Sequence, residues 1–213
     1  MRTEDLIAGL ARGAGAVEPH AVARRYAAAI GWGAFGATLL MALLLRVRAD
    51  IAQAVWLPMF WVKLGFAAVL FAIALALAAR LARAAKPLGH LPLALALPVL
   101  VVWTMAAAEL VAAPPGQRLP LVLGQTWERC PFLVTMLSLP TLAAAFWATR
   151  RLAPTRLVRA GAACGLVAGA LAACIYALHC PEMSPAFLGT WYVIGMLIPT
   201  ALGAALSPRL LRW

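Results

Sequence analysis

The stretch FWVKLGFAAVLFAIALALAA, residues 60–79, contains a single charged side chain, that of Lys63. About 20 mostly apolar residues in an α-helix cross a hydrocarbon core of about 30 Å, so this run has the length and composition of a transmembrane helix. It is apolar on all faces and rich in alanine and leucine, whereas a strand of a membrane barrel alternates apolar and polar residues. The sequence therefore predicts an all-α membrane protein.

Five further runs of the same kind accompany it. We expect transmembrane helices over residues 26–45, 60–79, 91–108, 131–149, 160–178 and 187–206. The composition agrees, because 65% of the 213 residues are hydrophobic and 12% are charged, whereas soluble domains are about 45–50% apolar. The predicted fold is a six-transmembrane-helix bundle over residues 26–206, with an N-terminal tail over 1–25 and a C-terminal end over 207–213.

The formal net charge of +11 follows the predicted membrane topology. Thirteen of the 18 lysines and arginines lie in the N-terminal tail, the second and fourth connections and the C-terminal end. Cytoplasmic segments of membrane proteins carry such an excess of basic residues. We therefore expect both termini in the cytoplasm, a lipid bilayer around the bundle, and no direct contact with nucleic acid.

The N-terminal tail can form a short amphipathic helix. Within MRTEDLIAGLARG, residues 1–13, Thr3 can cap the helix, and Leu6, Ile7 and Leu10 form one apolar stripe. Glycines in this tail each cost about 1 kcal/mol relative to alanine, and isolated helices this short are marginal in water. The segment could order against a partner; the alternative is a frayed tail at the membrane surface.

Two cysteines lie at similar depth on the side opposite to the tail. Cys130 is in ERCP, just before the fourth run, and Cys180 is in HCPE, just after the fifth. In a bacterium this side is the oxidising periplasm, where paired thiols form disulfides and exposed thiols meet oxidants and soft metals. The residues alone leave a structural disulfide, a redox-sensitive pair and a metal site equally open.

A metal site at this position would use Cys130 and Cys180 as its ligands. His179, Glu128 and Glu182 are the possible auxiliary ligands, of the types that zinc or cadmium accept. The spacing matches no known metal motif.

The remaining polar groups inside the runs indicate structural roles. Cys164 and Cys174 lie ten residues apart in one run, about 15 Å along a helix axis, so they cannot share one disulfide. Lys63 and Glu109 lie at the same end of neighbouring runs, and we expect them to form an ion pair.

Glycines and prolines mark sites of close packing and bending. The fifth run contains a repeated small-xxx-small spacing that lets a neighbouring helix approach closely: Gly161, Gly165 and Gly169. Three runs contain a proline near their middle, where we expect kinks: Pro98, Pro140 and Pro199. Such breaks also occur around the substrate sites of transporters.

The sequence contains no enzyme motif. A membrane thiol oxidase is expected to use a Cys-x-x-Cys pair, and neither this pair nor HExxH is found. We expect a binding or signalling protein without a resident cofactor, in which a soft metal ion could act transiently as a signal. A small multi-span transporter or channel is the alternative.

Five motifs together resemble the NrsF family of bacterial six-span anti-sigma factors. They are TEDLIAGLA at 3–11, APTR at 153–156, YALHCPE at 176–182, TWY at 190–192 and SPRLLRW at 207–213.

The resemblance implies an inner-membrane protein that holds an extracytoplasmic-function sigma factor inactive at its cytoplasmic side. It implies release of the sigma factor on periplasmic heavy-metal or oxidative stress. The family's periplasmic cysteines correspond to Cys130 and Cys180, and its sigma-contacting segment corresponds to residues 1–17.

Overall fold

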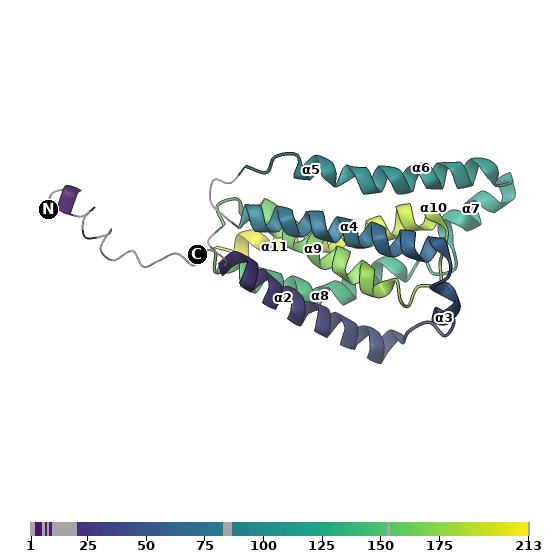
Figure 1. The fold of residues 1–213 in the computed structure, drawn as a ribbon, viewed down its shortest axis with the longest axis horizontal. Coiled ribbons are helices and arrows are strands. Elements are labelled where there is room, and N and C mark those ends of the chain that lie inside the picture. Colours follow the sequence, from purple (N-terminus) through teal and green to yellow (C-terminus); the bar gives the residue numbers. More distant parts are fainter. Residues whose placement is uncertain are drawn as a thin grey trace.

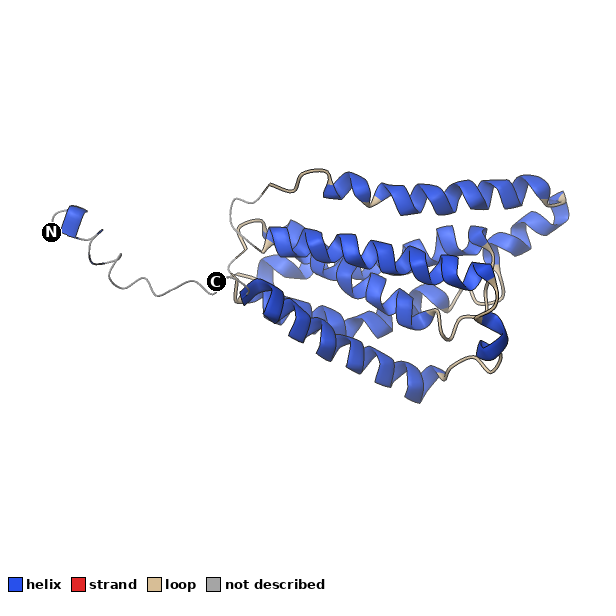
Figure 2. Ribbon diagram, viewed as in Figure 1, coloured by secondary structure: helices blue, strands red, loops and turns tan. Residues whose placement is uncertain are grey.

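The computed structural model describes residues 3–5, 7, 9, 21–82, 87–152 and 154–212. These residues form helices and connecting loops without a strand (Figure 2). Six helices are long and apolar enough to cross a membrane: Val22–Leu45, Pro58–Leu81, Leu91–Ala112, Cys130–Arg150, Leu157–Tyr176 and Pro185–Leu210. Their ends lie within four residues of the predicted runs, so the prediction of six long apolar helices is confirmed.

Several of these spans are divided into shorter elements. The first consists of α2 (Ala21–Leu40) and a π-helical turn, η1 (Met41–Leu45), and the last of α10 (Pro185–Phe187), a second π-helical turn η2 (Leu188–Tyr192) and α11 (Val193–Leu210). The second, fourth and fifth spans are the single helices α4 (Pro58–Leu81), α8 (Cys130–Arg150) and α9 (Leu157–Tyr176). The third consists of α5 (Leu91–Ala94) and α6 (Ala96–Ala112), and two connections contain the short helices α3 (Ile51–Ala54) and α7 (Pro115–Leu123).

Proline accounts for one of these divisions. The helical pattern is interrupted at Leu95, between α5 and α6. Pro98 follows three residues later, and its ring clashes with the carbonyl of the residue four positions earlier, Ala94. The kink expected near Pro98 thus coincides with an interruption of the helix. Pro140 and Pro199 lie inside α8 and α11, and the kinks expected there stay predictions.

Helix α9 is the central helix of the bundle. It packs against α4, α8 and α11 (Figure 1), and thirteen of its 20 residues are buried. By contrast, α6 lies along the outside of the bundle (Figure 1), and only Val102 and Ala106 among its residues are buried. Most of the other side chains of α6 are exposed on the surface of the bundle.

Small residues set the distance between α9 and α11. A Cβ atom added to Gly165 would collide with the carbonyl oxygen of Pro199, and one added to Gly161 would collide with that of Gly203. Lipid tails are as apolar as leucine, so close backbone approach through small residues is a main source of helix association in membranes. The predicted role of this glycine repeat in packing is confirmed.

The bundle has two buried clusters, one towards each end. We call the end where α2 begins and α11 ends the terminal end, and the opposite end, with α3, α7 and α10, the cysteine end (Figure 1). The cluster towards the terminal end contains Tyr26, Cys164 and Leu211. There the Tyr26 hydroxyl and Thr149 Oγ1 form a buried hydrogen bond of 2.6 Å. Cys164 is fully buried, whereas Cys174 is half-buried.

Candidate functional site

Cys130 and Cys180 lie in one buried cluster at the cysteine end. Cys130 is the first residue of α8, and its N–H donates to the Thr126 carbonyl at 2.9 Å. Cys180 follows the end of α9, and its N–H donates to the Tyr176 carbonyl at 2.9 Å. Both side chains are fully buried and both thiols are free. The structure therefore brings together the two cysteines that the sequence singled out.

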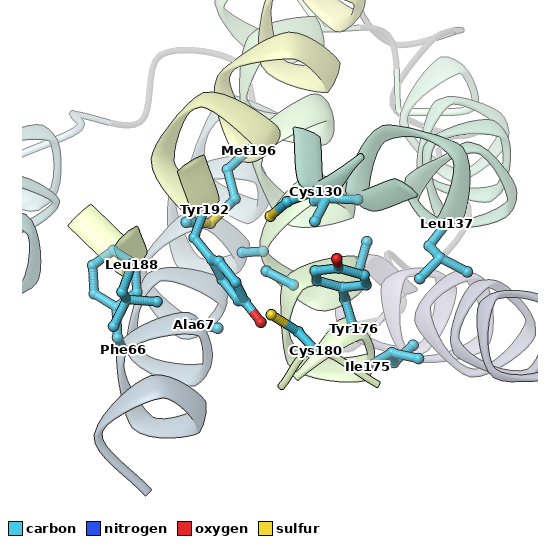
Figure 3. Close-up of a cluster of buried hydrophobic side chains, with 14 of the residues drawn as sticks. Phe66, Ala67, Cys130, Leu137, Ile175, Tyr176, Cys180, Leu188, Tyr192 and Met196 are labelled. Atoms are coloured by element: carbon cyan, nitrogen blue, oxygen red, sulfur yellow. The ribbon is translucent and has the colours of Figure 1, made fainter. Parts of the chain in front are cut away.

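Two tyrosines flank the thiols. The rings of Tyr176 and Tyr192 lie 5.8 Å apart between centroids, and the two cysteine side chains are next to them (Figure 3). The Tyr192 hydroxyl points towards the Cys180 sulfur (Figure 3). In the described part of the chain, this hydroxyl and that of Thr141 are the buried side-chain oxygens without a hydrogen-bond partner.

Lys63 of α4 is buried beside the same thiols, with 1% of its surface exposed. Its ammonium donates to the carbonyl oxygen of Cys180 at 2.8 Å and to that of Glu182 at 3.0 Å. The Nζ atom also lies 5.9 Å from the centroid of the Tyr192 ring. The ammonium thus binds the backbone of the cysteine-containing connection.

The predicted ion pair between Lys63 and Glu109 is wrong. Both residues are described, and no ion pair joins them. Glu109 of α6 instead accepts hydrogen bonds from Ser184 Oγ at 2.6 Å and from the Ala186 N–H at 3.2 Å. The reason is that the connection between α9 and α11 provides partners for both residues. Its carbonyl oxygens accept from the Lys63 ammonium, and its donor groups bind the Glu109 carboxylate.

Arg48 attaches the first connection of the bundle to the cysteine-containing one. Its Nη1 donates to the Cys180 carbonyl at 3.3 Å, and its backbone N–H donates to the Leu178 carbonyl at 3.1 Å. The same guanidinium forms an ion pair with Asp50 at 2.6 Å. Two hydrogen bonds from this guanidinium to the Asp50 carboxylate, of 2.7 and 2.6 Å, hold the pKa of the Asp50 carboxyl below its usual range.

His179 and Glu182 are both engaged in hydrogen bonds. His179 Nδ1 donates to the Arg46 carbonyl at 2.8 Å, because a carbonyl oxygen can only accept. Glu182 Oε1 accepts from the Gln125 N–H at 2.7 Å and from Thr126 Oγ1 at 3.2 Å. The Glu182 interactions join the turn after Cys180 to the turn before Cys130, whereas His179 binds the first connection.

A complete metal centre is not formed by these residues. Among the described residues, no group of three or more His, Cys, Asp and Glu side chains is arranged to hold a metal ion. The predicted auxiliary ligands His179 and Glu182 have the partners given above, and Glu128 is exposed. The described residues at this site therefore provide two free thiols but no set of three or more metal ligands.

The predicted partner-binding stripe lies largely outside the described residues. Leu6 and Leu10 are outside the described residues. Ile7 is described, and 60% of its side chain is exposed.

Sequence reasoning missed three residues of the site: Tyr176, Tyr192 and Arg48. The tyrosines are part of YALHCPE and TWY, and a tyrosine inside an apolar run needs a partner for its hydroxyl, which could have drawn attention to them. Arg48 carried no local signal, since one arginine in a short connection is ordinary.

The fold and the site define a multi-pass helical membrane protein in which buried polar side chains hold a cysteine-containing connection in place. Residues 10–213 match the family described as "Negative regulator of sigma F", NrsF. The chain is 54% identical over 213 residues to the "Probable anti-sigma-F factor NrsF" of Azospira oryzae, with both chains covered completely. It is 38% identical over 219 residues to the "Anti-sigma-F factor NrsF" of Caulobacter vibrioides, again with both covered completely. No solved structure matches it.

The chain belongs to the NrsF family of anti-sigma-F factors. This is a family of transcription regulators that bind a sigma factor, and not of enzymes. The resemblance found in the sequence motifs is thereby confirmed. The transporter or channel alternative has no support from these relatives.

Proposed function

We propose that this anti-sigma factor holds an extracytoplasmic-function sigma factor inactive on the cytoplasmic side of the bacterial inner membrane. It releases the sigma factor when metal or oxidative stress in the periplasm reaches Cys130 and Cys180. The match to anti-sigma-F factors over residues 10–213 supports the proposed inhibition of a sigma factor. The buried pair of free thiols at one end of the bundle supports the proposed sensing by Cys130 and Cys180.

The distribution of charge supports the proposed orientation. Several arginines lie at the terminal end or in the connections that reach it, among them Arg80, Arg150, Arg159 and Arg209. Excess basic residues favour the cytoplasmic side. With the terminal end in the cytoplasm, the cysteine end faces the oxidising periplasm.

The chemistry of the site favours a reaction of the two sulfurs. Thiolates are the preferred ligands of soft metal ions, and two thiols can also be oxidised to a disulfide with the loss of two electrons and two protons. His179 and Glu182 would first have to leave their hydrogen-bond partners to join a metal. We therefore assign the first contact with either signal to Cys130 and Cys180.

Packing provides a route from the thiols to the rest of the bundle. Cys130 begins α8, and Tyr192 and Met196 lie with both thiols in one tightly packed cluster. Because a packed core does not deform continuously, a change at the sulfurs alters the packing of the fourth and sixth spans. A coupling free energy of about 1–3 kcal/mol changes partner occupancy about 5- to 150-fold.

The test of partner binding uses the apolar stripe of the tail. Replacing Leu6, Ile7 and Leu10 together by Asp should abolish retention of the sigma factor in a pull-down from membranes. The control, Ala8→Asp with Arg12→Asp, makes the same total change in charge on the opposite face of the helix predicted within residues 1–13 and should leave retention intact. Retention of the sigma factor by the triple variant would refute the role of the tail.

A further inference from the structure

We propose that Lys63 and Glu109 are positioning residues that hold the two ends of the connection over residues 180–186 and thereby keep the Cys180 thiol buried. The inference rests on the proposed function only in treating Cys180 as a sensing thiol. The two side chains come from different helices, α4 and α6. Lys63 donates hydrogen bonds to backbone carbonyl oxygens of the connection, and Glu109 accepts hydrogen bonds from its donor groups.

The connection has little backbone structure of its own. Among the hydrogen bonds between described residues, none is donated by the backbone of residues 181–184. Pro181 and Pro185 have no N–H group to donate. Side chains from outside the connection must therefore fix its path, because unpaired buried backbone groups are costly.

Lys63 fixes the first part of the connection. Its ammonium reaches the carbonyl oxygens of Cys180 and Glu182, two residues apart, and so determines the turn between them. Lys63 has no carboxylate partner among the described residues. A buried ammonium without a counter-ion depends on such acceptors, so the turn and the charge stabilise each other.

Glu109 fixes the second part. Its Oε2 atom accepts from Ser184 Oγ and from the Ala186 N–H. Ser184 Oγ in turn caps α10 by accepting from the Ala186 and Phe187 N–H groups at 3.1 and 3.4 Å. The carboxylate thus sets the residue at which the last span begins.

This starting point determines where Tyr192 lies. Helix α10 continues without interruption into η2, which ends at Tyr192. A second contact from α6, the hydrogen bond of 3.0 Å from Trp103 Nε1 to the Gly189 carbonyl, fixes the same turn. Lys63 therefore positions Cys180, and Glu109 positions the tyrosine that faces its sulfur.

The test measures how fast each thiol reacts with a water-soluble maleimide in the full-length chain in detergent micelles, with site-resolved mass spectrometry. Cys174→Ala removes the half-buried thiol from all variants. Lys63→Met and Glu109→Ala should each raise the labelling rate of Cys180 at least tenfold. The rate of Cys164, which is buried in the cluster towards the terminal end, should stay at the parent value.

Matched variants separate positioning from general effects. Arg209→Met and Glu4→Gln change an exposed basic residue and an exposed glutamate outside the site and should leave both rates unchanged. Glu109→Gln keeps an acceptor oxygen for Ser184, so it should raise the Cys180 rate less than Glu109→Ala does.

Two results would overturn the inference. One is an unchanged Cys180 rate in both Lys63→Met and Glu109→Ala. The other is a parallel rise at Cys180 and Cys164, which would mean that the substitutions only unfold the bundle. The measurement needs neither sigma factor nor stress, so a failure of the proposed signalling would leave this inference standing.

Discussion

The Lys63 ammonium donates a hydrogen bond of 2.8 Å to the carbonyl oxygen of Cys180, 117 residues further along the chain. This contact places a buried charge of the second span directly against the connection that contains a candidate sensing thiol. It also explains why a lysine is present in an otherwise apolar stretch, since charged residues within membrane spans are costly and need a partner.

The first prediction concerns the thiol pair. Replacing both Cys130 and Cys180 by Ser should abolish release of the sigma factor on metal or oxidative stress while leaving repression in unstressed cells intact. The reason is that serine preserves size but is neither a soft ligand nor open to disulfide formation. A reporter gene dependent on the sigma factor measures both states.

The control pair for this experiment is Cys164→Ser with Cys174→Ser. These substitutions remove the other two thiols of the chain, and the stress response should persist. A normal response in the Cys130 and Cys180 double variant would exclude these thiols as the sensor.

The second prediction compares two buried tyrosine hydroxyls. Tyr26→Phe removes the buried hydrogen bond to Thr149 and should lower the free energy of unfolding by about 1 kcal/mol. Tyr192→Phe removes a hydroxyl without a hydrogen-bond partner and should leave that free energy unchanged or raise it, because an unpaired buried polar group is itself destabilising. Thermal unfolding in detergent compares the two variants; a larger loss for Tyr192→Phe than for Tyr26→Phe would contradict the expectation.

The third prediction concerns the packing of α9 on α11. Gly165→Ala places a methyl group against the Pro199 carbonyl and should destabilise the bundle by about 1–3 kcal/mol. Gly31→Ala is the matched control, because nothing lies within 4 Å of an added Cβ at that position. Thermal unfolding and the yield of monodisperse protein provide the comparison, and equal stability of the two variants would argue against this helix contact.

The fourth prediction tests the interaction between the two cysteine-containing turns. Glu182→Ala removes the acceptor for the Gln125 N–H and Thr126 Oγ1 and should cost about 1–3 kcal/mol of stability. Glu182→Gln retains an acceptor oxygen and should cost less. Glu128→Ala alters an exposed carboxylate and should have little effect on the unfolding temperature; an equal loss from Glu128→Ala and Glu182→Ala would refute the assignment.

The sequence predicted the spans well and the side-chain partners poorly. All six helices lie where the apolar runs are, because in a bilayer the backbone must satisfy its hydrogen bonds within each segment. The neighbourhood of Cys130 and Cys180 also followed from their similar depth. Lys63 and Glu109 were predicted at the same end of their spans, but their predicted partners were wrong. The depth of a residue along its helix does not reveal which hydrogen-bonding groups a loop from another part of the chain places beside it.

Tyr192 illustrates the same limit. Its position depends on the start of α10 and on the π-helical turn η2, and neither has a strong signal in the apolar sequence around it. Sensing by the thiols, the side of the membrane and the partner-binding role of Leu6, Ile7 and Leu10 stay predictions.

By itself, the sequence determined that this protein is a bundle of six membrane helices with two cysteines near one end, because hydrophobic length and charge distribution are local properties. The tertiary structure alone decided that Lys63 binds the Cys180 and Glu182 carbonyls and that Glu109 binds Ser184 and Ala186. These contacts join residues that are far apart in the chain, and they depend on how the helices pack and where the last connection passes between them.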